Sequence, residues 1–190
     1  KSEKNSDIFS KKDINFFIAA GRLTRQKNFI YLVKEFAKFV KVYPKEKLLI
    51  FGEGELKNKI LNEIKKNNVS RNINLCGYTD NVYKYMLNSK AFLLSSLWED
   101  PGFVMIESAL CNCFIISSNC KNGPKEFLLN GDAGLIFESN KNEELFKKLC
   151  EFKKLETKYI LKKKLLAKKN SMNFTMFRHY LNFKNIIDLN

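Results

Sequence analysis

The chain has 190 residues and carries 34 Lys and Arg against 20 Asp and Glu, a net charge of +14. Apolar residues make up 45%, which is enough for one sizeable core and excludes a disordered chain. No stretch approaches the roughly 20 continuous apolar residues of a membrane span. The polar start, 1–13, has no initiator Met and no signal-peptide pattern. We therefore expect a single domain, 1–190, that is a fragment of a longer protein.

The positive charge comes from 30 Lys and only four Arg, beside 22 Asn. Such a composition is typical of an AT-rich genome, so part of the charge reflects mutational bias. A nucleic-acid binder more often clusters its charge and uses Arg forks, whereas these lysines are spread along the chain. We expect anionic partners such as phosphates, and no nucleic-acid partner.

The cysteines and the single histidine argue against a zinc site. Five Cys occur without a C-x-x-C pair, and His179 is the one histidine. An odd number at irregular spacing favours a reduced, cytosolic compartment with the thiols in the core. We expect no metal.

Short apolar runs alternate with amphipathic segments along the whole chain. The runs predict buried strands, at 15–20, 48–51, 73–76, 91–94, 114–117 and 134–137. The other segments predict helices at 29–40, 56–64, 82–87 and 102–111, and one that opens at 123–124. Beyond the last strand, the chain is predicted to be helical to about 170 and again over 172–188. This alternation predicts an α/β fold: a Rossmann-like, doubly wound parallel sheet of about six strands, with helices on both faces and further C-terminal helices. The α/β core would cover 14–170.

Ligands of doubly wound sheets bind beyond the carboxyl ends of the strands. After the first predicted strand, Gly21 permits a tight turn, and Arg22 and Lys27 place a guanidinium fork and an ammonium on one loop. Such a pair suits a diphosphate, although a solvated basic loop explains this segment equally well. Gly52 and Gly54 follow the second strand and permit close backbone approach to a ligand, but glycines also end strands for structural reasons.

The end of the fourth predicted strand is the most informative, because Glu99 and Glu107 bracket seven residues there. If the next helix begins near Gly102, the amides of Phe103 and Val104 are unpaired donors at its positive end and form an anion site. Glu107 lies on an otherwise apolar helix face, where a carboxylate needs hydrogen-bond donors. The vicinal hydroxyls of a sugar supply two.

The Glu99-to-Glu107 spacing resembles the E-x(7)-E motif of retaining glycosyltransferases of the GT-B fold, especially family 4. Other matching pieces are G-R-L with Lys27, the G-E-G-E-L from Gly52, and S-S, G-P-K-E, N-G and G-L-I-F between 117 and 137. Their order covers nearly the whole chain. The resemblance is to the C-terminal half of such an enzyme, which binds the nucleotide sugar.

The resemblance implies roles for the charged residues. Arg22 and Lys27 would clamp the donor diphosphate and balance its charge as it leaves. Glu99 would contact the transferred sugar and stabilise positive character at its anomeric carbon, and Glu107 would accept hydrogen bonds from the ribose hydroxyls. Because Arg22 and Lys27 would balance the charge of the leaving diphosphate, we expect no metal and no cofactor other than the donor substrate.

Backbone groups would complete the implied nucleotide site. Gly102 with the amides of Phe103 and Val104 would bind the phosphates, Thr79 would hold the base, and Gly52 would lie close to the nucleotide. The implied donor is a UDP-sugar, favoured over a GDP-sugar on family frequency alone.

The implied reaction is hexosyl transfer with retention to a glycan or lipid-linked acceptor in microbial surface polysaccharide or glycoconjugate synthesis. The helix 172–188, with Phe174, Phe177 and Tyr180, would cross back to a missing N-terminal domain, so the isolated fragment would be inactive. Asp100 and Pro101 replace a Gly and an aromatic residue of the family pattern, which leaves the sugar open. Asn112 replaces a Gly at a helix end, where Asn tolerates the left-handed conformation.

Three alternatives stay open. A sugar-nucleotide epimerase or a phosphorylase has the same fold, but the Lys, carboxylate and His groups that they need are not visible. A non-enzymatic basic module would need its lysines in one continuous stripe. The lysines at 162–164 and 168–169 are typical of a solvated helix face, and contact with anionic lipid is the alternative. The expected localisation is therefore cytoplasmic, with peripheral contact at the inner face of the plasma membrane as the variant.

Overall fold

A parallel sheet of six strands forms the centre of the molecule. The computed structural model describes residues 16–100, 102–174, 178, 180, 183, 184 and 187. The strands are β1 (Phe16–Ala20), β2 (Lys47–Phe51), β3 (Ile73–Gly77), β4 (Ala91–Leu94), β5 (Ile115–Ser118) and β6 (Leu135–Phe137). Their order in space is β3-β2-β1-β4-β5-β6, which confirms the predicted Rossmann-like fold. The order reverses between β1 and β4, so ligands are expected beyond the carboxyl ends of these two strands.

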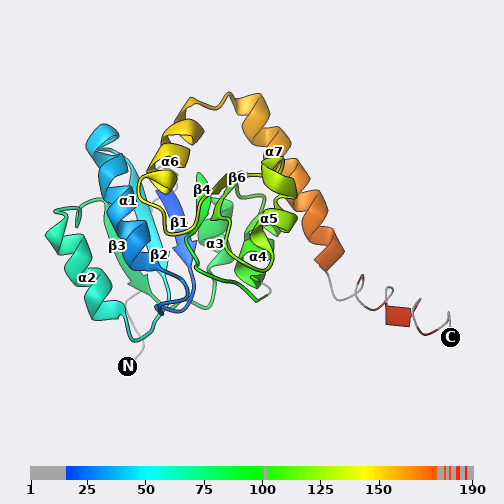
Figure 1. The fold of residues 1–190 in the computed structure, drawn as a ribbon, viewed down its shortest axis with the longest axis horizontal. Coiled ribbons are helices and arrows are strands. Elements are labelled where there is room, and N and C mark those ends of the chain that lie inside the picture. The colour runs from blue at the N-terminus through cyan, green and yellow to red at the C-terminus, as the bar shows by residue number, and fades with distance from the viewer. Residues whose placement is uncertain are drawn as a thin grey trace.

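Helices cover both faces of the sheet (Figure 1). They are α1 (Phe29–Val42), α2 (Lys57–Lys66), α3 (Tyr83–Leu87), α4 (Phe103–Leu110), α5 (Pro124–Phe127), α6 (Glu144–Lys154) and α7 (Thr157–Ser171), with 3-10 turns at Leu129–Gly131 and Met172–Phe174. One core cluster joins the sheet to α1, α2 and α6, and a second joins it to α3, α4, α5 and α7. Of the described helices, none combines the length and apolar character that crossing a bilayer requires.

Most of the strands are apolar runs because both of their sides are buried. The edge strand β3 is the exception, since Asn74 is exposed and the residues after it are half-buried. In β1, Phe17 and Ala19 face the α1 side, and Phe16 and Ile18 face the α4 side. A strand with one solvated face would alternate with polar residues instead. Each predicted strand is therefore present, with its ends within one residue of the predicted ones.

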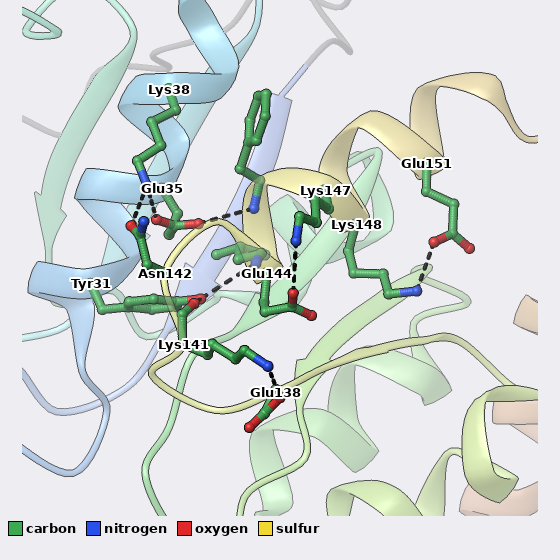
Figure 2. Close-up of polar contacts among 12 residues, drawn as sticks. Tyr31, Glu35, Lys38, Glu138, Lys141, Asn142, Glu144, Lys147, Lys148 and Glu151 are labelled. Atoms are coloured by element: carbon green, nitrogen blue, oxygen red, sulfur yellow. Dashed lines mark hydrogen bonds and ion pairs between the residues drawn. The ribbon is translucent and has the colours of Figure 1, made fainter.

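Side chains of α1 cap the first turn of α6 (Figure 2). The Tyr31 hydroxyl accepts a hydrogen bond from the Leu145 amide at 3.4 Å, and a Glu35 carboxylate oxygen accepts one from the Phe146 amide at 3.3 Å. Lys38 donates to the other oxygen of Glu35 at 2.7 Å. First-turn amides lack partners inside their own helix, so these contacts satisfy them and fix α6 on α1. Burial raises the pKa of Tyr31 to about 12.

The Lys-rich C-terminal region differs from the prediction most clearly at Lys163, and Lys164 is half-buried as well. The expectation that all of 162–164 is a solvated helix face is wrong for Lys163. Its ammonium donates to the carbonyl oxygens of Gly131 at 2.5 Å and Gly134 at 3.2 Å. Burial lowers the pKa of Lys163 because it disfavours the charged form. The predicted crossing helix at 172–188 lies largely outside the described residues, including Phe177 and His179.

Candidate functional site

The loops after β1 and β2 are interlocked through their backbones. The Gly21 amide donates to the Phe51 carbonyl at 3.0 Å, and the Leu23 amide donates to the Glu53 carbonyl at 2.9 Å. The Leu56 amide returns a bond to the Leu23 carbonyl at 2.9 Å. These bonds extend the β1–β2 pairing beyond the strands, so the predicted phosphate loop has a rigid base.

The glycines of the second loop pack against the first loop. A Cβ atom on Gly52 would lie 1.9 Å from the carbonyl oxygen of Gly21, and one on Gly54 would lie 2.7 Å from that of Leu23. The neighbouring backbone therefore explains why glycine occurs at both positions. A contact between Gly52 and a nucleotide stays a prediction.

Lys27 and Glu99, predicted from separate motifs, form a buried ion pair. The Lys27 ammonium donates to both carboxylate oxygens of Glu99, at 2.7 and 2.8 Å. The side chains are 13% and 2% exposed, respectively. Lys27 passes over Gly21, where a Cβ atom would lie 3.2 Å from its Cε atom. The loops after β1 and β4 thus meet through opposite charges at the point where the strand order reverses.

A group of serines holds the Glu99 side of this pair. The Ser96 hydroxyl donates to a Glu99 carboxylate oxygen. The carbonyl of Ser96 accepts from the hydroxyls of Ser118 at 2.7 Å and Ser139 at 3.2 Å, so its own position is fixed by β5 and the loop after β6. Sequence reasoning missed Ser96. The available signal was the second of two serines after a fully apolar strand, three residues before the motif Glu.

The helix α4 begins at the predicted place beside this pair. Gly102 has φ of 76° and precedes Phe103, the first residue of α4. A Cβ atom on Gly102 would lie 3.4 Å from the Cβ of Glu99, so the helix end is adjacent to that carboxylate. The amides of Phe103 and Val104 belong to the first turn, which has no acceptors within the helix.

The other end of α4 confirms the expectation for Asn112, which adopts φ of 54°. Its amide donates to the Ala109 carbonyl at 2.9 Å, and the Cys113 amide donates to the Ser108 carbonyl at 3.0 Å. These two bonds form a Schellman motif, which usually requires glycine at the left-handed position and also accepts asparagine.

Glu107 lies one turn along α4 and is half-buried. The Tyr83 hydroxyl, from the start of α3, donates to a Glu107 carboxylate oxygen at 3.3 Å. The negative charge of Glu107 raises the pKa of Tyr83 because it disfavours a second anion nearby. Sequence reasoning did not identify this tyrosine.

The remaining predicted site residues lie on the loops after β1 and β3. The side chain of Arg22 is exposed, and Thr79 is half-buried. The Thr79 hydroxyl accepts a hydrogen bond from the Asn81 amide at 3.3 Å. This bond uses the Thr79 side chain and does not involve the Thr79 backbone, which is the part predicted to hold the base. The roles of Arg22 and Thr79 toward a nucleotide stay predictions. Within the described part of the chain, no group of His, Cys, Asp and Glu is arranged to hold a metal ion.

Comparison with known proteins identifies the class of this chain. Residues 1–171 match the family "Glycosyl transferases group 1", and the chain belongs to this family. It is 43% identical over 117 residues to the uncharacterized glycosyltransferase MJ1059 of Methanocaldococcus jannaschii, covering 62% of this chain and 29% of that protein.

A second relative has a defined activity. It is the N-acetylgalactosamine-N,N'-diacetylbacillosaminyl-diphospho-undecaprenol 4-alpha-N-acetylgalactosaminyltransferase of Campylobacter jejuni. The identity is 33% over 156 residues, covering 80% of this chain and 42% of that enzyme. The chain therefore spans less than half the length of both relatives.

Solved structures show the same fold. A glycosyltransferase from Rickettsia africae aligns with a TM-score of 0.80 at 20% identity, over 92% of this chain and 47% of that one. A mutant of S. aureus TarM in complex with UDP aligns with a TM-score of 0.77 at 24% identity, over 82% of this chain and 31% of that one.

Proposed function

We propose that this chain is the nucleotide-sugar-binding half of a retaining glycosyltransferase of family 4. It would move a hexosyl group from a nucleoside diphosphate sugar to a glycan or lipid-linked acceptor. The observation that carries the proposal is the Lys27–Glu99 ion pair beside the first turn of α4, at the reversal of strand order. A cation, a carboxylate and the first-turn amides of a helix there are the groups that a sugar diphosphate requires.

The cations would act on the leaving group. When the acceptor hydroxyl oxygen bonds to the anomeric carbon, the bond between the sugar and the diphosphate breaks. Its electron pair passes to a phosphate oxygen, which also takes the proton of the acceptor hydroxyl. Lys27 would turn from Glu99 toward that oxygen, and the exposed Arg22 side chain would close over the diphosphate with its guanidinium fork. The amides of Phe103 and Val104 would bind the same phosphates, so that charge develops against groups already in place.

The carboxylates would bind the two sugars of the donor. Glu99, oriented by the Ser96 hydroxyl, would accept a hydrogen bond from the transferred sugar and stabilise positive character at its anomeric carbon. Glu107 would accept from the ribose hydroxyls, which would replace or join the Tyr83 hydroxyl on its carboxylate. Thr79 would hold the base through its backbone, beside Gly52.

The choice of donor and acceptor follows the relatives. UDP is bound in the TarM mutant complex, and UDP and GlcNAc are bound in the pneumococcal O-GlcNAc transferase GtfA, which favours UDP over GDP as the nucleotide. The Campylobacter enzyme acts on a diphospho-undecaprenol-linked glycan, and a Bacillus subtilis relative is a poly(glycerol-phosphate) alpha-glucosyltransferase. A glycan or lipid-linked acceptor in surface polymer synthesis is therefore proposed.

The acceptor site would belong to an N-terminal domain, which the segment 172–188, predicted from the sequence to be a helix, would cross to reach. The chain by itself would then bind nucleotide and turn over poorly. The proposed setting is the cytoplasm, with peripheral contact at the inner face of the plasma membrane.

Calorimetry with UDP, GDP and inorganic pyrophosphate tests the proposal. We expect Glu107→Ala to weaken UDP binding about tenfold or more, since hydrogen bonds to a charged group each contribute about 1.5–3 kcal/mol. Pyrophosphate binding should change little, because it has no ribose. Glu156→Ala, at an exposed position before α7, is the control with the same change of charge.

Equal weakening of UDP and pyrophosphate would remove the ribose role of Glu107. Absence of affinity for every nucleoside diphosphate would overturn the proposed function itself.

A further inference from the structure

The C-terminal part of the chain carries charge of one sign. Between residues 157 and 187 the sequence has no Asp or Glu, while α7 alone contains six Lys. The neighbouring helix α6 differs, because its Lys147 and Lys148 pair with Glu144 and Glu151 within the helix. Among the described residues, Lys158 is the α7 lysine with an ion-pair partner, Glu156 at 3.0 Å, which lies just before the helix. The positive charge of α7 is therefore largely unbalanced.

One side of α7 faces the body of the molecule. Ala167 and Ser171 are buried there, and Leu166 packs against the α4 side of the core. Lys163 also points inward, toward the carbonyls of Gly131 and Gly134. Asp132 and Glu151 lie close enough to act electrostatically on this inward-pointing Lys163.

The opposite side of α7 exposes large apolar side chains among lysines. Leu161, Leu165 and Met172 are 56%, 67% and 55% exposed. Their spacing of four and seven residues places them along one line of the helix. Four exposed lysines lie beside this line: Lys158, Lys162, Lys168 and Lys169. We call these seven residues the outer face of α7; Met172, directly after the helix, is its last member.

We propose that the outer face of α7 docks on an anionic lipid surface. Leucine and methionine side chains would enter the boundary between headgroups and acyl chains, and the lysine ammonium groups would extend to the anionic headgroups. In Figure 1, α7 runs along the margin of the molecule, and it packs against α4, whose first turn is at the proposed donor site. Docking would therefore hold that site close to a lipid-linked acceptor. Only this last consequence rests on the proposed function.

The outer face fits other partners less well. None of its residues carries a guanidinium to bind phosphates as a fork. The adjacent exposed ring of Tyr159 is already contacted by the Lys158 ammonium, 4.9 Å from its centroid, so base stacking there would compete with this contact. A second copy of the chain would bring like charges together, which disfavours self-association through this face. Anionic lipid offers both negative headgroups for the lysines and acyl chains for the leucine and methionine side chains of the outer face.

Sedimentation of the 190-residue chain with lipid vesicles, without nucleotide, tests the proposal. We expect binding to vesicles of phosphatidylglycerol and phosphatidylcholine, weakened by salt, and little binding to phosphatidylcholine alone. Lys162→Ser with Lys169→Ser should weaken binding about fivefold for each lysine. Lys45→Ser with Lys59→Ser is the matched control: both are exposed, outside α7, and remove the same net charge.

A second variant pair separates insertion from charge. Leu161→Ser with Leu165→Ser leaves the net charge unchanged and should fold, because both side chains are exposed. We expect it to weaken vesicle binding at least tenfold without changing the salt dependence.

Three outcomes would overturn the proposal: equal weakening by the control lysine pair, no effect of the leucine pair, or equal binding to vesicles of phosphatidylcholine alone. Tighter binding to a DNA duplex, insensitive to the leucine pair, would assign the face to nucleic acid instead. Because no nucleotide is present, failure here would leave UDP binding untouched, and the reverse also holds.

Discussion

Replacing Lys27 by Met should destabilise the domain more than replacing Glu99 by Gln. Lys27→Met leaves the Glu99 carboxylate buried, with only the Ser96 hydroxyl as its donor among the contacts described above. Glu99→Gln leaves an ammonium whose side chain is 13% exposed and long enough to reach water. The amide also keeps an oxygen that can accept from Ser96.

The expected magnitudes follow from this asymmetry. Removing one partner of a buried ion pair costs about 3–5 kcal/mol, and the remaining Ser96 bond places Lys27→Met near 3 kcal/mol. We expect about 1 kcal/mol for Glu99→Gln, close to the value of one hydrogen bond. For a domain of this size, 3 kcal/mol corresponds to a fall in Tm of about 6–12 °C.

Urea unfolding measures both variants, with an unchanged slope m as the check that the unfolding reaction is the same. The matched control is Lys57→Met, at the ion pair Lys57–Glu53, where the side chains are 47% and 49% exposed and 3.1 Å apart. An exposed pair should contribute at most about 1 kcal/mol. The reasoning is refuted if Glu99→Gln lowers the free energy of unfolding as much as Lys27→Met does. It is also refuted if Lys57→Met lowers it as much as Lys27→Met does.

Two further predictions concern the packing of the loops and the core. Gly52→Ala should cost about 3 kcal/mol, because its Cβ would lie 1.9 Å from the Gly21 carbonyl, whereas Gly131→Ala, at φ of 107° with open space around it, should show only a backbone penalty of about 1–2 kcal/mol. Equal losses in thermal melts would contradict the steric explanation. Burial raises the pKa of Cys113 to about 12 from an ordinary 9, so the neutral thiol belongs to the folded state. Its contribution to stability is complete below pH 9 and is lost as the pH rises from 9 through 12. Thiol labelling at about pH 8 should leave Cys113 unmodified until unfolding, and labelling as fast as at the half-buried Cys150 would argue against this.

Much of the fold was predictable because a strand that is buried on both sides consists of consecutive apolar residues, which are visible in the sequence. The run 91–94 predicted β4 without error at either end. The left-handed Asn112 was also predictable, because the tolerance of Asn for that conformation is a property of the residue itself. In both cases, the residues at the position itself determine the local backbone conformation.

The candidate site was predictable only in part. Lys27 and Glu99 were selected from motif spacing, but 72 positions separate them, and only the neighbouring positions of β1 and β4 bring the two loops together. Ser96 and Tyr83 were missed because a serine or a tyrosine is ordinary in sequence. Their importance comes from the carboxylate that each one faces in the fold.

The lysines of α7 show the same division. The sequence by itself determined the net charge, the absence of acids after residue 156 up to 187, and the helical character of this region. It could not separate Lys162 from Lys163, which are adjacent and chemically identical. The tertiary structure places Lys163 on the carbonyls of Gly131 and Gly134 and leaves Lys162 in solvent. Successive helix residues are rotated by about 100°, and only packing against the rest of the molecule decides which one turns inward.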